Sequence, residues 1–252
     1  MTVEQERNLA EPPLKGKAVL VTGAARRIGR ALALGSARAG ADVVIHYCHS
    51  GEEAAGTKRE IESMGRRAWM IQADFEEPAG IPRLIEGAAS LVPLFGLVNS
   101  AAIFEAREFQ DTSLSDWHRN LAVNLTAPYL LTQSFARQLA PGQTGRVVNI
   151  LDWRALHAEA GHLAYTISKA GLAALTRSLA LALAPSINVN GLALGAILPH
   201  PGGPAESRIL DSIPAGRWGQ LIEVEDALIF LLSGPAYVTG EIIHVDGGRH
   251  LV

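Results

Sequence analysis

Short apolar runs alternate along the chain with longer segments whose apolar residues recur at helical spacing. The apolar runs, each read as a buried strand, lie at 17–22, 42–47, 67–73, 94–98, 147–151, 188–192 and within 237–248. The helical segments between them lie at 30–39, 52–64, 81–91, 114–138, 163–183 and 223–232. Strands that alternate with helices throughout a chain predict one doubly wound parallel sheet of the α/β class.

Two segments lack this pattern. Residues 1–14 are charged, contain Pro12 and Pro13, and are expected to form a flexible tail before a single catalytic domain at 15–252. Residues 199–219 are rich in Pro, Gly and Ser. A loop of that length in a compact domain is often a substrate lid.

Composition narrows the functional classes. The 252 residues are 48% hydrophobic, enough for one large core, and the net charge of -3 argues against a nucleic-acid or anionic-membrane partner. Cys48 is the only cysteine, which excludes an internal disulfide framework and fits a reducing compartment. Neither a signal segment nor a membrane span is visible, and the histidines lack metal-ligand spacing. We therefore expect a cytoplasmic protein that binds no metal.

The first strand enters a glycine-bearing turn that opens a helix. The turn contains Gly23, Arg26, Arg27, Ile28 and Gly29. Glycine lets the backbone approach a pyrophosphate, and a helix N-terminus offers N–H groups with a positive dipole end. The pattern indicates a dinucleotide site, although an ordinary tight turn between strand and helix would also contain these glycines.

The end of the second strand favours NADPH over NADH. Dinucleotide folds that bind NAD carry an acidic residue near this position, but no acid occurs here before Glu52. His49, Ser50 and Arg26 are candidates to contact a 2′-phosphate. Asp74, at the end of the third strand, is a candidate partner of the adenine ring.

Tyr165 and Lys169 are four residues apart in a helical segment, so their side chains share one face. An ammonium beside a phenol is expected to lower the phenol's pKa and suit it for proton transfer. Asp152 follows the apolar run at 147–151 and would emerge at the carboxyl end of a strand, where open α/β sheets bind ligands. This spacing alone is weak, because a helix with Tyr and Lys on its wet face shows it too.

Three more residues are candidates for the same site. The fourth strand ends at Asn99, followed by small residues that let the chain pass under a flat ligand. Phe104 follows at the expected mouth of the cleft, although core packing is equally compatible with it. Asn124 lies on an apolar helix face, where an amide needs partners such as water or a backbone carbonyl.

Taken together, these segments resemble the classical short-chain dehydrogenases/reductases over residues 16–251. The matching motifs are TGAARRIG at 22–29, NSAA at 99–102, Asn124, YTISK at 165–169 and YVTGEIIHVDGG at 237–248. The resemblance implies a single-domain Rossmann-type sheet with helices on both faces and a nicotinamide cofactor. It also implies that Tyr165 is the acid/base, that Lys169 binds the nicotinamide ribose, and that Asn124 supports a proton-relay water. Family members are commonly homotetramers paired through long helices, here those at 114–138 and 163–183.

The chain departs from the family pattern at four places. Arg27 replaces the middle glycine of the turn, NSAA replaces NNAG, Leu194 replaces a proline, and Asp152 replaces the catalytic serine. The first and last of these are similar to the pteridine reductase branch, which also has a phenylalanine at the Phe104 position that sandwiches the pterin against the nicotinamide. Leu194 fits neither group.

Asp152 also bears on the substrate by its chemistry. An ionised carboxylate accepts hydrogen bonds and would repel the charge that develops on a ketone oxygen, so it suits a ring with N–H donors or a site where it stays protonated. In a pterin site, Arg27, Phe104, Asp152 and Tyr165 would contact the substrate. We therefore favour an NADPH-dependent reductase of a pterin or dihydrofolate-like C=N bond. The alternatives are a carbonyl reductase of 3-oxoacyl-thioester or other ketone type, and a non-catalytic dinucleotide-binding regulatory protein.

Overall fold

The computed structural model describes residues 11–105, 107–157, 161–198 and 209–252. Within them, seven parallel strands form one sheet in the order β3-β2-β1-β4-β5-β6-β7. The strands are β1 (Ala18–Val21), β2 (Asp42–Tyr47), β3 (Ala68–Gln72), β4 (Gly96–Asn99), β5 (Gly145–Asp152), β6 (Ile187–Leu194) and β7 (Ile242–Val245). The predicted doubly wound parallel sheet is confirmed.

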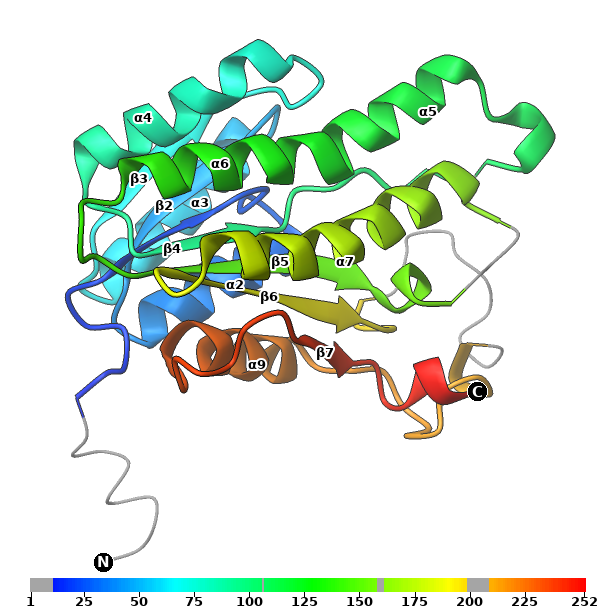
Figure 1. The fold of residues 1–252 in the computed structure, drawn as a ribbon. Helices are drawn as coiled ribbons and strands as arrows, with labels where there is room; N and C mark the ends of the chain where they lie inside the picture. Colours follow the sequence, from blue (N-terminus) through cyan, green and yellow to red (C-terminus); the bar gives the residue numbers. More distant parts are fainter. Residues whose placement is uncertain (1–10, 106, 158–160, 199–208) are drawn as a thin grey trace, which may run out of the picture.

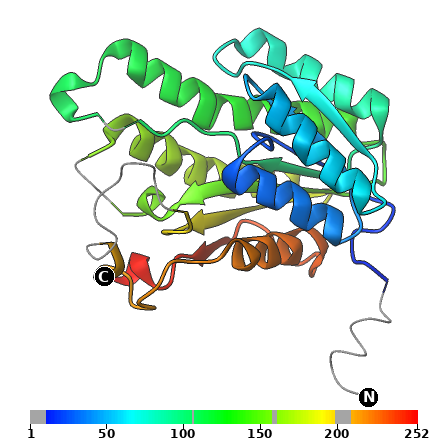
Figure 2. The ribbon, with the colours of Figure 1, turned by 180° about the vertical axis from the view of Figure 1, so that it is seen from behind.

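Helices cover both faces of the sheet. One face carries α2 (Arg27–Arg38), α3 (Gly51–Ser63) and α9 (Leu221–Ser233), and this layer faces the viewer in Figure 2. The other carries α4 (Ile81–Leu91), α5 (Leu114–Leu121), α6 (Ala127–Gln138) and α7 (Leu163–Leu183), in front in Figure 1. Alternate residues of β1 enter the two cores: Val19 packs in the α2 and α9 layer, and Leu20 in the α4 and α6 layer. This two-sided burial explains why the strands read as continuous apolar runs.

The strand order reverses between β1 and β4. From β1 the chain winds outward through β2 to β3, then returns to pair β4 with the other side of β1. Such a switch point leaves a crevice at the carboxyl ends of the strands, and ligands bind there in open α/β sheets. The fold therefore places the glycine turn after β1 and the end of β4 beside each other.

The predicted helix at 114–138 is continuous but changes character midway. Residues Ala122–Thr126 form a π-helical turn between α5 and α6. A π-turn widens a helix locally and is frequent at functional sites. Asn124 lies in this turn, fully buried.

The expected tail boundary is wrong at Leu14, the last residue assigned to the tail. Leu14 is fully buried in the α2-side core, and its N–H donates to the carbonyl of Ala39 at 2.9 Å. Burial of the apolar Leu14 side chain in the core fixes this residue, although the residues around it are polar. Residues 1–10 lie outside the described part of the chain.

Part of the expected lid, 199–208, also lies outside the described residues. In the remaining part Ile213 is buried, and the N–H of Ala215 donates to the carbonyl of Gly247 at 3.0 Å. None of the described helices combines the length and apolar character needed to cross a bilayer.

Candidate active site

A cavity of about 590 Å³ opens at the carboxyl ends of the central strands. Its wall is built by the glycine turn, the ends of β2, β3, β4 and β5, and one face of α7. It brings together most of the predicted site residues: Gly23, Arg26, Arg27, Ile28, Gly29, His49, Ser50, Asp74, Phe104, Asp152, Tyr165 and Lys169.

The glycine turn has the geometry that a pyrophosphate cradle requires. Gly23 has φ 65°, and a Cβ there would lie 2.9 Å from Ala101 Cα; a Cβ on Gly29 would lie 2.2 Å from the Gly23 carbonyl oxygen. Arg27 keeps the left-handed backbone, φ 52°, at the position where the family has its middle glycine. Arg26 is the N-cap of α2 and makes no side-chain capping bond. The first-turn N–H groups therefore suit an anionic ligand.

His46, a residue that the sequence reading missed, ties this turn to β2 and β3. Its Nδ1 accepts from the Gly23 N–H at 3.1 Å, so Nε2 carries the proton and donates to the Ala73 carbonyl at 3.1 Å. Burial lowers the pKa of His46 to about 4, and its ring stacks on Phe75. The available clue was a histidine inside the predicted apolar strand at 42–47.

The end of β2 meets the start of α3 at the far side of the cavity. Ser50 is the N-cap of α3 and makes no side-chain capping bond. Arg26 Nη1 lies 3.6 Å from Glu53 Oε1 in the first turn of that helix. In the described part of the chain, ligand atoms of Cys48, His49 and Asp74 lie within 4.8 Å of one another, a spacing that a metal ion could use.

Tyr165 and Asp152 are directly hydrogen-bonded. The Tyr165 hydroxyl donates to Asp152 Oδ2 at 3.1 Å. Asp152 is the last residue of β5, and Arg154 holds its carboxylate: the Arg154 N–H donates to Oδ1 at 2.9 Å, and Nη1 lies 3.2 Å from Oδ1 and 3.4 Å from Oδ2. In each of these contacts Asp152 accepts from an N–H or O–H donor, as an ionised carboxylate does. Sequence reasoning missed Arg154, whose only clue was its place two residues after Asp152.

Lys169 lies near this pair. The sequence predicted that Lys169 would lower the pKa of Tyr165, and this prediction is wrong. Its Nζ donates to the Ile150 carbonyl at 2.8 Å and lies 5.8 Å from the centre of the Tyr165 ring. Burial, and then the neighbouring Asp152 carboxylate, raise the pKa of Tyr165 well above its usual value. Burial lowers the pKa of Lys169 to about 8, against the opposing effect of Asp152. Desolvation and Asp152 outweigh the opposing effect of Arg154, so Tyr165 is a protonated donor here.

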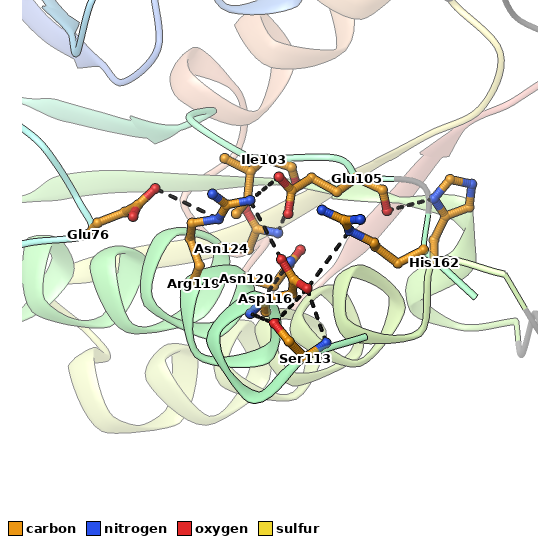
Figure 3. A network of polar contacts seen from close by, with 10 residues as sticks. Glu76, Ile103, Glu105, Ser113, Asp116, Arg119, Asn120, Asn124 and His162 are labelled. Carbon is orange, nitrogen blue, oxygen red and sulfur yellow. Dashed lines mark hydrogen bonds and ion pairs between the residues drawn. The ribbon is translucent and has the colours of Figure 1, made fainter. Parts of the chain in front are cut away.

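Asn99 and Asn124 are buried beside the site and bind its backbone and neighbouring side chains. Asn124 accepts from the Ile103 N–H at 2.9 Å and donates to the Ile103 carbonyl at 3.1 Å (Figure 3). It also donates to Ser168 Oγ at 3.0 Å. The expected backbone-carbonyl partner is therefore present. The buried Asn99 side chain donates to Asn149 Oδ1 at 2.8 Å and does not line the cavity. Period-two alternation turned this side chain away from the cavity.

Phe104 lies at the mouth, 41% exposed, and lines the cavity. Its ring meets the Tyr165 ring edge-on, with centres 4.7 Å apart, and stacks on His162 at 4.3 Å. Leu194, the departure that fitted neither family group, ends β6 as the register partner of Asp152 and lines the same cavity. β6 thus runs two residues further than predicted.

Comparison with known proteins fixes the family. A family model described as enoyl-(acyl carrier protein) reductase matches residues 23–250. A 3-oxoacyl-[acyl-carrier-protein] reductase of Aquifex aeolicus is 38% identical over 249 residues, covering 94% of this chain and 99% of that protein. The chain belongs to the short-chain dehydrogenase/reductase family. It is an oxidoreductase that uses a nicotinamide dinucleotide.

Solved structures show the same fold. FolM alternative dihydrofolate reductase 1 from Brucella canis, complexed with NADP, superposes with a TM-score of 0.90 at 34% identity, covering 96% of this chain and 97% of that one. A gluconate 5-dehydrogenase from Burkholderia cenocepacia, in complex with NADP and tartrate, gives a TM-score of 0.89 at 30% identity over 96% and 98%. The relatives thus share the fold and differ in substrate.

Proposed function

We propose that this enzyme uses NADPH to reduce a C=N bond in a flat, pterin- or dihydrofolate-like ring. The observation that carries the proposal is the hydrogen bond from the Tyr165 hydroxyl to Asp152, with Arg154 holding the same carboxylate. An ionised carboxylate only accepts hydrogen bonds, so it suits a substrate ring that offers N–H donors, as an aminopyrimidine does. It would repel the charge that forms on a ketone oxygen.

The residues present fit NADPH. The Gly23 turn and the α2 N-terminus would hold the pyrophosphate, and Lys169 the nicotinamide ribose. Arg26 and Ser50, the latter at the uncapped start of α3, would surround a 2′-phosphate. No acidic residue lies between β2 and Ser50 to repel that group. When bound, NADPH supplies the hydride.

The protein's own side chains would orient the ring and deliver the proton. Asp152 would accept from the ring's N–H groups, and Phe104 would stack on its face. Tyr165, kept protonated by burial and by Asp152, would donate its phenolic proton to the ring nitrogen as the neighbouring carbon receives the hydride. The likeness to the Brucella dihydrofolate reductase structures supports this choice of substrate.

A carbonyl reductase is the second candidate. The 38% identity to the Aquifex 3-oxoacyl reductase favours it, and Asp152 would then be a tolerated replacement of serine. The two candidates differ in whether a flat ring is needed at Phe104.

We also propose a cytoplasmic homotetramer. Leu114 on α5 and Ile167 and Leu181 on α7 are exposed apolar side chains on the helices through which family members pair. The single cysteine fits a reducing compartment. Sedimentation of the purified protein tests the assembly.

NADPH oxidation by the purified protein tests the function. Dihydrobiopterin and dihydrofolate are compared with an acetoacetyl thioester under the same conditions. The proposal expects turnover of a pterin with a higher kcat/KM than the thioester. Turnover of the thioester alone would contradict it and favour the second candidate.

A further inference from the structure

The imidazole of His162 covers Phe104, the aromatic side chain at the cavity mouth. Their ring centres are 4.3 Å apart with planes inclined by 22°. On the Tyr165 side the contact is different, because the rings meet at 78°. Phe104 therefore lies against an imidazole and a phenol while it lines the cavity.

His162 is held where it stacks. It is the N-cap of α7 and has a left-handed backbone, φ 57° and ψ 39°, which is strained for a non-glycine residue. Its Nδ1 lies 3.0 Å from the Glu105 carbonyl oxygen, so Nδ1 carries the proton and donates. The stack and this hydrogen bond offset the backbone strain. Three residues later in α7 comes Tyr165, so one helical turn carries two rings that touch Phe104.

The backbone on both sides of Phe104 is also fixed, as Figure 3 shows. Asn124 binds the N–H and the carbonyl of Ile103. The Glu105 carboxylate pairs with Arg119 on α5, which also lies 3.9 Å from Glu76 Oε1. Because the backbone is anchored at 103 and 105, the orientation of the Phe104 ring depends on what packs against it.

We propose that His162 is a positioning residue that sets the Phe104 ring as a platform for a flat heteroaromatic substrate. It would act through Phe104 and touch neither substrate nor cofactor, since it does not line the cavity. The inference rests on the proposed function for the flatness of the substrate. It adds a residue that selects flat rings over open-chain carbonyl compounds. Stacked aromatic pairs are worth enough to change an affinity severalfold.

Three variants separate the ring of His162 from its hydrogen bond. His162→Gly and His162→Asn both accept the left-handed backbone, and only Asn retains a side-chain donor for the Glu105 carbonyl. His162→Phe retains the ring and loses the donor. The proposal expects KM for dihydrobiopterin to rise roughly fivefold or more in the Gly and Asn variants and less than about twofold in Phe. The dissociation constant of NADPH and kcat stay near the wild-type values in all three.

Calorimetric binding of folic acid in the presence of NADP⁺ keeps this test independent of turnover. Weaker binding in the Gly and Asn variants supports the role of His162, even if the wild type reduces no pterin and the proposed reaction fails. Equal folate affinity in the wild type, Gly and Asn proteins would overturn it, as would a wild type that binds no folate. Equal losses of NADPH and folate affinity would also overturn it, because they indicate general disruption. The Gly and Asn comparison stands if the Phe variant does not fold.

Discussion

The hydroxyl of Tyr165 donates to Oδ2 of Asp152 at 3.1 Å. The family's proton donor is thus held by the residue that replaces the family's serine. A serine would share its own proton with the substrate oxygen, whereas this carboxylate can only accept. With serine the site suits a substrate group that accepts a hydrogen bond. With Asp152 it suits a substrate group that donates one.

Arg154 should be needed for this reversed preference. Removing its guanidinium in Arg154→Gln leaves Asp152 without its cation, and a lost charged hydrogen bond costs about 1.5–3 kcal/mol. We predict that kcat/KM for the reduced pterin falls roughly 10- to 100-fold, and that Arg154→Lys retains part of the activity. Arg67→Gln, which removes an exposed ion pair to Asp42, is the matched control. Unchanged kinetics in Arg154→Gln would show that Asp152 does not need the Arg154 guanidinium.

Ser50→Asp should reverse the choice of dinucleotide. The new carboxylate would stand at the start of α3, where it repels a 2′-phosphate but still caps the helix. We predict that KM for NADPH rises at least about tenfold while KM for NADH falls or stays the same. Ser90→Asp, on the exposed face of α4, should change neither. A preserved preference for NADPH would place the 2′-phosphate elsewhere.

Gly23→Ala should damage the cofactor cradle. Its Cβ would lie 2.9 Å from Ala101 Cα, and the left-handed backbone adds strain of about 1 kcal/mol or more. We predict at least a roughly tenfold weaker NADPH affinity and a lower melting temperature. Gly80→Ala meets open space and should leave both unchanged. Normal NADPH affinity in Gly23→Ala would mean that the pyrophosphate does not lie against this turn.

His46 should make the folded state sensitive to acid. Burial lowers its pKa to about 4, so between pH 6.5 and 4 the unfolded chain binds a proton that the folded protein does not. The stabilisation is complete above pH 6.5 and is lost as pH falls toward 4. We predict that His46 accounts for roughly 2–3 kcal/mol of the loss in unfolding free energy from pH 7 to 4.5. Urea unfolding of His46→Gln should show a pH dependence smaller by that amount; an identical slope would refute the assignment.

The sequence predicted the fold well because periodicity reports burial directly. The bounds of β2 and α4 were met, and the helix at 114–138 differs only in the π-turn at Asn124. The hydrophobic pattern failed to predict burial where a single residue packs into the core. Leu14 is an isolated apolar residue in a polar segment, and only the folded core shows where it goes.

For the site, contiguous motifs supplied the residues on the cavity wall, and tertiary contacts supplied the rest. Arg154 and His162 act through neighbours whose positions depend on the turn after β5 and on a left-handed residue before α7. The spacing of residues along the sequence predicts neither this turn nor the left-handed backbone. The Tyr165 pKa was expected to fall because the pattern shows the nearby Lys169 but not the depth of burial.

The most direct test of the account is Asp152→Ser, measured by NADPH oxidation with dihydrobiopterin and with an acetoacetyl thioester. Restoring the family's hydroxyl should lower kcat/KM for the pterin at least about tenfold, because the acceptor for its ring N–H groups is lost. The same change should preserve or raise kcat/KM for the thioester. Unchanged or improved pterin turnover in Asp152→Ser would contradict the role assigned to this carboxylate, and with it the proposed substrate class.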